Sequence, residues 1–317
     1  MIKFKKILIS SVLFLLFPAV VNAAGNDKDT EHLVARRISP TRYEKTGEDL
    51  SVHFIDVGQG NAVFIETPSG KNLLYDGGGS PAWMKTSWDP GERIVVPYIK
   101  KLGYDRIDYV IVSHAHGDHI AGLVAVLKEF DIGVVFDPGY DHTGQSYTEF
   151  LEVIDQLDIS FDIMRAGQGD KIDLGEDIVT TIFGPPEDYY FRGTNSDINN
   201  NSIVLKLKYG EVNFLFPGDL ETRGEKYCVR QYREDLTANV LQVGHHGSRT
   251  SSTMPFLRQV LPEVAVIPVG ENNTFGHPRP EALNNLEQVG AEIYRTDYDG
   301  TVIVYTNGEQ FVVETAE

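Results

Sequence analysis

Three histidines and one aspartate occur within six residues, at the point where an apolar segment ends. The stretch Tyr109-Val-Ile-Val-Ser-His-Ala-His-Gly-Asp-His-Ile-Ala-Gly122 has the pattern of a buried β-strand followed directly by a helix. Alternate side chains of the connecting loop point the same way, so His114, His116 and Asp118 can converge. The intervening glycine gives the backbone room to bring His119 towards them. Imidazole and carboxylate groups are ligands for zinc, manganese and iron. The motif therefore predicts a metal centre at the end of a strand.

Three more apolar segments end in side chains of the same kinds. Asp219 directly follows the segment 214–218, and His245 and His246 follow a segment that starts at residue 239. His277 lies in a loop after a third segment. An aspartate in the position of Asp219 is by itself more often the cap of the helix that follows. Four strand ends that carry metal-ligating residue types nevertheless favour one shared site.

Strand-like and helix-like segments alternate along the chain in two similar halves. The pattern predicts strands at 51–57, 62–66, 71–75, 109–112, 134–136, 177–183, 202–209, 212–216, 238–243, 264–269, near 293 and at 301–305. It predicts helices at 92–102, 119–129, 146–157, 220–236 and 281–289. This order fits one α/β domain in which two sheets pack face to face with helices on both outer sides.

The first 48 residues differ in character from the rest. A basic start, an apolar run over 7–17 and the small-residue site Val21-Asn-Ala23 together predict a secretory signal peptide over residues 1–23. The apolar run is shorter than the roughly 20 residues that span a bilayer, so we expect cleavage and export rather than stable membrane insertion. Residues 24–48 are polar and without periodicity, which indicates a flexible leader before a domain over 49–317.

The charge balance restricts the choice of substrate. The chain has a net charge of −18, and the predicted cleavage removes three lysines and no acidic residue, which makes the mature value −21. A field of this sign repels polyanions, so a nucleic-acid substrate would need a local basic patch or the metal ions to hold its phosphates. The single Cys228 cannot form an internal disulfide, so stability must come from a packed core and from bound metal.

The motifs taken together resemble the metallo-β-lactamase superfamily, whose fold is a four-layer αββα sandwich. Several stretches are similar, more narrowly, to the exported hydrolase domain of ComEC-like DNA-uptake proteins and their relatives. These are Phe54-Ile-Asp-Val-Gly-Gln-Gly60, Asn200-Asn-Ser-Ile-Val-Leu205, Pro217-Gly-Asp219, His245-His-Gly-Ser248 and Gly276-His-Pro278. The resemblance spans residues 51 to about 306. Asn61 departs from it, because the subgroup commonly has an acidic residue there.

The resemblance implies a site for two divalent metal ions, zinc or manganese. His114 and His116 would hold the first ion; Asp118, His119 and His245 would hold the second, and Asp219 would bridge the two. Many members have a third histidine on the first ion, near the position where this chain has Asn199-Asn-Asn201. The first ion would then be completed by Asn201 or by water, or bind more weakly. Asp76 would brace the histidine loop from outside the ligand shell.

The implied reaction is hydrolysis by a metal-activated hydroxide. Asp118 would orient the nucleophile and accept its proton, and His246 and His277 are candidates for the leaving oxygen. Arg249 and Arg279 are candidates to hold phosphate, although each is more readily explained as a surface charge.

Three classes of function are compatible with the sequence. The favoured one is a secreted phosphodiesterase that acts on DNA or another nucleic acid. The alternative is an exported hydrolase of a different bond, such as a cell-wall phosphorylcholine ester, a lactone or a β-lactam. A binding protein on an inactive hydrolase fold is the third, and the intact metal motif argues against it. The sequence indicates no protein partner.

Overall fold

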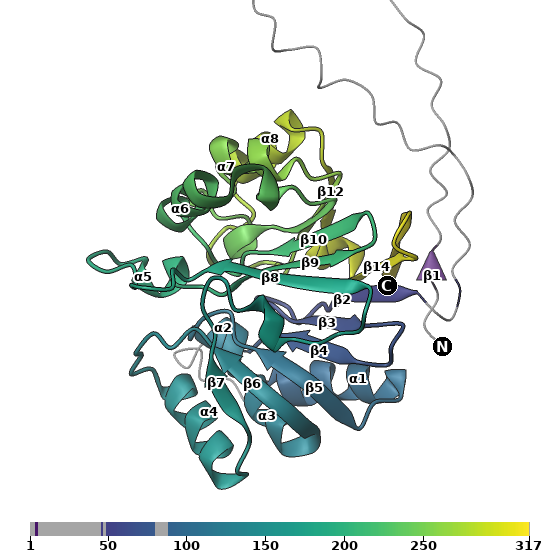
Figure 1. The fold of residues 1–317 in the computed structure, drawn as a ribbon, viewed down its shortest axis with the longest axis vertical. Coiled ribbons are helices and arrows are strands. Elements are labelled where there is room, and N and C mark those ends of the chain that lie inside the picture. Colours follow the sequence, from purple (N-terminus) through teal and green to yellow (C-terminus); the bar gives the residue numbers. More distant parts are fainter. Residues whose placement is uncertain (1–3, 6–45, 47–48, 80–87, 317) are drawn as a thin grey trace, which may run out of the picture.

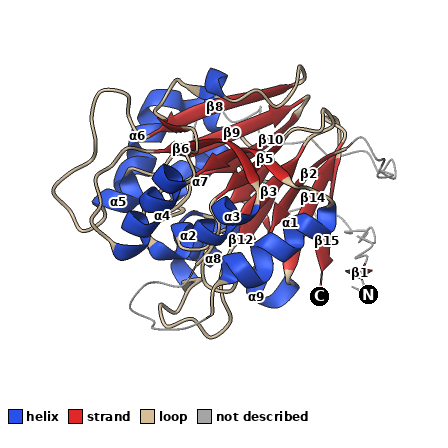
Figure 2. Cartoon of the chain, turned by 90° about the horizontal axis from the view of Figure 1, so that it is seen from below, coloured by secondary structure: helices blue, strands red, loops and turns tan. Residues whose placement is uncertain are grey.

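The computed structural model describes residues 4–5, 46, 49–79 and 88–316. The predicted signal peptide and leader lie outside these residues, apart from Phe4–Lys5 and Thr46. Two sheets form the centre of the molecule, and their strands run side by side in Figure 2.

The first sheet has nine strands in the order β1-β15-β14-β2-β3-β4-β5-β6-β7. From β4 to β7 the strands are parallel, and the other pairs are antiparallel. Their bounds are β1 (Phe4–Lys5), β2 (Leu50–Phe54), β3 (Val63–Glu66), β4 (Asn72–Tyr75), β5 (Arg106–Ile111), β6 (Asp131–Asp137), β7 (Phe161–Ile163), β14 (Thr301–Thr306) and β15 (Phe311–Ala316).

The second sheet has six strands in the order β13-β12-β11-β10-β9-β8. Strands β10 to β13 are parallel, whereas β9 is antiparallel to both of its neighbours, β8 and β10. Their bounds are β8 (Ile178–Gly184), β9 (Val204–Tyr209), β10 (Val212–Phe216), β11 (Val240–Gln242), β12 (Val264–Ile267) and β13 (Glu292–Arg295).

Helices cover the outer face of each sheet (Figure 1). The first sheet is covered by α1 (Val96–Leu102), which continues a π-helical turn at Gly91–Val95, and by α2 (Gly117–Ile120), α3 (Leu123–Glu129) and α4 (Gln145–Gln156). The second is covered by α6 (Thr222–Tyr232), α7 (Met254–Val260) and α8 (Pro280–Gln288). Two single helical turns, α5 (Asp197–Asn200) and α9 (Thr296–Asp299), lie in loops, and three-residue or four-residue 3-10 turns occur at Gly169–Lys171, Arg233–Leu236 and Gly244–Gly247.

The main core lies between the two sheets. Strand β10 shows how the alternation of side chains builds it: Phe214 and Phe216 face the first sheet, while Leu215 packs beneath the outer helices. All three side chains are fully buried. The predicted α/β sandwich, with helices on both outer sides, is confirmed.

The observed elements differ from the prediction in a few places. The predicted helix 119–129 is two helices, α2 and α3, which break at Ala121 and Gly122. A Cβ atom on Gly122 would lie 2.1 Å from the carbonyl oxygen of Gly77, so only glycine allows the two loops to approach this closely. The sequence analysis missed α7, β7 and β15. Within the described residues, no helix is both long enough and apolar enough to cross a bilayer.

Candidate metal centre

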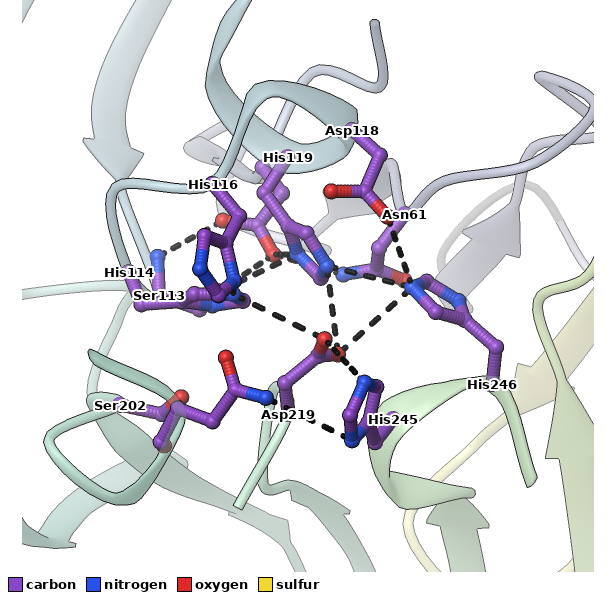
Figure 3. Close-up of polar contacts among 12 residues, drawn as sticks. Asn61, Ser113, His114, His116, Asp118, His119, Ser202, Asp219, His245 and His246 are labelled. Carbon is purple, nitrogen blue, oxygen red and sulfur yellow. Dashed lines mark hydrogen bonds and ion pairs between the residues drawn. The ribbon is translucent and has the colours of Figure 1, made fainter. Parts of the chain in front are cut away.

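The predicted ligands come from both sheets and meet at one edge of the sandwich (Figure 3). Asp76 follows β4, and His114 to His119 follow β5 in the first sheet. Asp219 follows β10, and His245 and His246 follow β11 in the second sheet. Because each of these strands is parallel to its neighbour, their carboxyl ends point to the same edge of their sheet.

Asp76 is buried at the base of the site and accepts hydrogen bonds from three residues. Its two carboxylate oxygens accept from the Ser113 backbone N–H and hydroxyl, each at 2.7 Å, and from the Asn61 amide at 2.9 Å. His119 Nδ1 lies 2.7 Å from Asp76 Oδ2. A carboxylate can only accept here, so Nδ1 carries the hydrogen, and the lone pair of His119 is on Nε2, which faces the centre.

His246 is oriented in the same way by a backbone group. Its Nδ1 lies 2.7 Å from the carbonyl oxygen of Pro268, which can only accept a hydrogen bond. Nε2 therefore carries the lone pair, and it lies 3.3 Å from Nε2 of His119. Two lone pairs that face each other at this distance repel, unless a cation or a proton lies between them.

Carboxylate oxygens complete this first group of acceptors. Nε2 of His246 is 3.4 Å from Asp118 Oδ2 and 3.7 Å from Asp219 Oδ1, and His119 Nε2 is 3.2 Å from Asp219 Oδ1. Asp219 Oδ1 is buried and has no hydrogen-bond partner in the described part of the chain. An orphaned carboxylate oxygen among bare imidazole nitrogens fits a divalent cation. The donor set therefore suits the metal that the motif predicts.

A second group surrounds the other oxygen of Asp219. His114 Nε2 lies 3.7 Å and His245 Nε2 lies 3.6 Å from Asp219 Oδ2. The remaining member is His116, whose Nδ1 is 3.0 Å from Nε2 of His114. Glu221 Oε1 lies 3.4 Å from Nδ1 of His245 and directs Nε2 of that ring inwards. His114, His119 and Asp219 thus form a second group of possible ligands, whose ligand atoms all lie within 4.8 Å of one another, and His116 and His245 border this group.

The turn after β11 brings two consecutive histidines to the same site. His245 (φ 50°) and His246 (φ 53°) both have left-handed backbone conformations, which are costly for residues with a side chain. In an extended loop consecutive side chains would point to opposite faces. The strained turn lets His245 and His246 approach Asp219 from two directions.

The electrostatics of the site favour positive charge. Burial opposes protonation of His119, but the carboxylates of Asp219 and Asp76 raise its pKa well above the ordinary value. Burial also opposes ionisation of Asp219, and the surrounding histidines, His119 first, hold its pKa well below the usual range. Burial and the neighbouring His119 lower the pKa of His114, which is therefore a neutral ligand. The site thus stabilises a proton or a metal cation.

The centre opens into a cavity of about 340 Å³. His116, Asp118, Asp219 and His245 form its floor. The other lining residues come from the histidine motif (Ala115 and Gly117), from the end of the loop before α4 and the first turn of α4 (His142, Gly144, Gln145, Ser146 and Tyr147), and from the loop after β12 (Phe275). The position of His142 in the sequence shows no spacing that links it to the histidine motif. The ring of His142 lies 6.3 Å from the ring of His116.

The family model for the metallo-beta-lactamase superfamily matches residues 55–271, which include every residue of both metal groups. This match covers more than half of the chain. The chain belongs to the metallo-beta-lactamase superfamily.

Within this superfamily the chain is similar to competence proteins. It is 28% identical to ComE operon protein 3 of Bacillus subtilis over 275 residues, which are 82% of this chain and 33% of that protein. It is 32% identical to the competence protein ComA of Neisseria gonorrhoeae over 254 residues, 80% of this chain and 32% of that protein. The predicted ComEC-like resemblance is confirmed, and the chain spans about a third of the length of these relatives. Among solved structures, the metallo-beta-lactamase fold protein YhfI of Bacillus subtilis is 11% identical, with 81% of this chain covered, 100% of that chain and a TM-score of 0.48.

The resemblance implied a third histidine on the first ion near the position where this chain has Asn199, Asn200 and Asn201. The structure shows which contacts these asparagines make instead. Asn201 exchanges two hydrogen bonds of 2.9 Å with the backbone of Phe191 and donates another to Asp197. Its amide is thus occupied away from the ions, contrary to the expectation that Asn201 completes the first site. Asn199 lies closer, with Nδ2 2.8 Å from Glu221 and 3.5 Å from His245.

The remaining predicted residues lie around the rim of the centre. His277 has its ring 5.6 Å from that of His245 and stacks on Phe275, a wall of the cavity. Arg279 is exposed, and its guanidinium donates to the carbonyl oxygen of Phe275. Arg249 is exposed and does not line the cavity. Only His277 of these three is packed against a metal-facing side chain.

Proposed function

We propose that the chain is a phosphodiesterase that uses two divalent ions, zinc or manganese, and acts on DNA or another nucleic acid. The observation that carries this proposal is the convergence of acceptor atoms on both oxygens of Asp219. A bridging aspartate between two imidazole groups is suited to a pair of cations, and paired cations suit hydrolysis of phosphodiesters. The similarity to proteins named for competence supports a nucleic-acid substrate.

The distances favour a ligand assignment that differs from the sequence-based one. Asp118, His119 and His246 would hold one ion. Pair distances alone assign His114, His116 and His245 to the other ion, with Asp219 between the two. In this assignment His245 takes the place of the third histidine that the asparagine segment lacks. His246, which the sequence analysis offered for the leaving oxygen, would be a ligand instead.

The chain's own residues supply orientation and proton transfer. When bound, the two ions generate hydroxide at neutral pH and neutralise charge on the phosphoryl oxygens. Asp118 lines the cavity, and His246 and His119 hold its pKa below the usual range despite its burial. Its carboxylate is therefore ionised at neutral pH and can orient the attacking water and accept its proton.

His277 is the proposed hydrogen-bond donor to the leaving oxygen. Burial and the neighbouring His245 lower its pKa to about 4, so the ring is neutral at pH 7 and carries one N–H. Its Nδ1 has no hydrogen-bond partner within the described residues. His277 packs on Phe275, which lines the cavity, and this would place its ring next to a bound phosphodiester.

Metal analysis combined with a substrate panel tests the proposal. We expect the purified protein to hold two ions per chain and to hydrolyse bis-p-nitrophenyl phosphate and single-stranded DNA, with loss of both activities in chelator. His116→Ala and Asp118→Ala should abolish turnover and leave the fold intact. Asp155→Ala, an exposed aspartate on α4, is the matched control and should keep full activity. Undiminished turnover in Asp118→Ala would contradict the mechanism.

A separate experiment tests whether His246, rather than His245, holds the same ion as Asp118 and His119. His246→Ala and His245→Ala should each keep about one ion per chain by elemental analysis, and the remaining ion should differ in affinity between the two variants. Two ions in His246→Ala, with one in His245→Ala, would restore the sequence-based assignment.

A different substrate is the second candidate, and the acidity of the chain favours it. A net charge of −18 suits a small substrate, such as a phosphorylcholine ester, a lactone or the cyclic amide of a β-lactam, better than a polyanion. Turnover of one of these in the panel, with no hydrolysis of any oligonucleotide, would establish this candidate.

We also propose that the chain is exported, on the strength of the N-terminal sequence pattern. The mature protein recovered from the medium or cell envelope should begin at Ala24. Recovery of the full-length chain from the cytosolic fraction alone would contradict export.

A further inference from the structure

A groove of about 390 Å³ runs along the exposed face of α6, away from the metal cavity. Arg223, Lys226 and Arg230 line it, and all three side chains are exposed. Their spacing of three and four residues places them on one face of the helix. The groove therefore presents a row of cations on a chain whose overall charge is strongly negative.

These cations are available for an outside ligand. Among the described residues none of Arg223, Lys226 and Arg230 forms an ion pair within 4 Å, although Asp197 is near enough to Arg223 for its own pKa to be lowered by that charge. Arg223 donates to the backbone carbonyl of Arg192, which leaves its positive charge without a bonded counter-ion. Glu225, the acidic residue in the groove wall, is buried and accepts hydrogen bonds from Ser252 and Thr253.

Tyr189 and Phe191, from the loop before α5, also line the groove. Tyr189 is 48% exposed and lies edge-on to Phe191, with ring centroids 5.6 Å apart. The Arg223 guanidinium lies 5.2 Å from the ring centre of Phe191. Cations for phosphates beside an exposed ring for bases form the combination that holds single-stranded nucleic acid. A duplex hides the faces of its bases, so the exposed ring of Tyr189 favours a single strand.

The groove is connected to the metal centre by hydrogen bonds. Its lining residue Phe191 is joined to Asn201 by two bonds of 2.9 Å, in the segment whose Asn199 faces His245. At the start of α6, Glu221 contacts His245 directly. The segments that line the groove are therefore in contact, through Asn201 and Glu221, with the residues around the metal groups.

From this arrangement we propose that the α6 groove binds the backbone and one base of a single-stranded nucleic acid and guides the strand towards the metal centre. The inference rests on the proposed phosphodiesterase function and names where its polymeric substrate is held. It also supplies the local basic patch that the charge of the chain requires for such a substrate.

Binding can be measured without hydrolysis on the full, metal-loaded chain. The probe is a fluorescein-labelled 20-nucleotide phosphorothioate oligothymidine, and its anisotropy is followed over a range of salt concentrations. The variant Arg223→Ala/Lys226→Ala/Arg230→Ala should bind at least about tenfold more weakly, and its slope of log K against log salt should fall by about 2, since each lost contact removes about 0.7. Tyr189→Ala should weaken binding about fivefold or more without a change of slope.

The control variant removes three exposed lysines elsewhere, Lys101→Ala/Lys128→Ala/Lys208→Ala, and so has the same net charge. It should bind like the unaltered protein, and circular dichroism should show both triple variants folded. The proposal is overturned by equal weakening in both triple variants, by equal affinity for a duplex, or by displacement of the probe by polyglutamate at matched charge concentration. Groove-dependent binding without hydrolysis of an ordinary oligonucleotide would retain the groove and remove the phosphodiesterase function. Hydrolysis of an ordinary oligonucleotide, with unaltered binding in the groove variant, would retain the phosphodiesterase function and remove the groove.

Discussion

At the scale of single residues, groups that contact Nδ1 orient three of the histidine rings in the centre. Asp76, Pro268 and Glu221 lie against Nδ1 of His119, His246 and His245, and each orients Nε2 of its ring towards Asp219. Asn61 supports the same arrangement, because its amide donates to Asp76. An acidic side chain at position 61 would place a second carboxyl group against Asp76.

Asp76→Asn tests this control of orientation. The amide group can accept at only one of its two ends, so it cannot accept both from the Ser113 backbone N–H, which bonds to Oδ1, and from His119, which bonds to Oδ2. We expect metal affinity and turnover to fall about 10- to 100-fold, as is usual when a group behind a metal ligand is lost. Metal titration and turnover measure the effect, with the exposed Asp173→Asn as control. Unchanged metal affinity in Asp76→Asn would show that Asp76 does not orient His119.

At the scale of the elements, α6 links the site to the outer helical layer. It starts three residues after Asp219, and its buried Glu225 accepts hydrogen bonds from the two residues before α7. Burial raises the pKa of Glu225 from its ordinary value of 4.5 to about 7. The native state therefore binds more protons than the unfolded state between about pH 4.5 and 7.

The free energy of unfolding should respond to pH through Glu225. A carboxyl group with a raised native pKa stabilises the fold fully below its unfolded value and loses that contribution as the pH rises towards 7. Glu225→Gln should make this part of the pH dependence flatter, as measured by urea unfolding between pH 5 and 8 in chelator. Glu234→Gln, an exposed residue of the same layer, is the control. An unchanged pH dependence in Glu225→Gln would contradict the raised pKa.

At the scale of the whole molecule, the proposed metal pair joins two sheets. The first sheet supplies His114 to His119 and the second supplies Asp219, His245 and His246. Without cations between them, these groups bring lone pairs and carboxylates together. Metal binding should therefore stabilise the packing of one sheet on the other, beyond what the buried core provides.

Chelation should lower the thermal midpoint of the protein by several degrees. A ligand present at 100 times its dissociation constant contributes about 2.7 kcal/mol, and about 1 kcal/mol corresponds to 2–4 °C in a domain of this size. Scanning calorimetry with and without chelator measures the shift, and Asp219→Asn should show little of it. An equal shift in Asp219→Asn would mean that the stabilising ions bind elsewhere.

The sequence by itself determined those features of this protein that depend on residues close together along the chain. Period-two and helical patterns identified most strands and helices, and the residue types at four strand ends identified the metal centre, because both depend on neighbours along the chain. It failed where the signal was short or non-periodic, as at β7 and α7. It also treated the α2–α3 segment as one helix, since the contact of Gly122 with Gly77 is not encoded locally.

The tertiary structure alone decided which side chains face one another. The resemblance implied that His245 is a ligand and made His246 a candidate for the leaving oxygen. Only the left-handed turn in the structure places His246 against Asp118 and His245 against Glu221. The contact of His142 with His116, and the position of the α6 cations beside Tyr189, join residues separated by tens of positions. Such pairings follow from how the two sheets and their loops pack in space, which no local pattern of residues specifies.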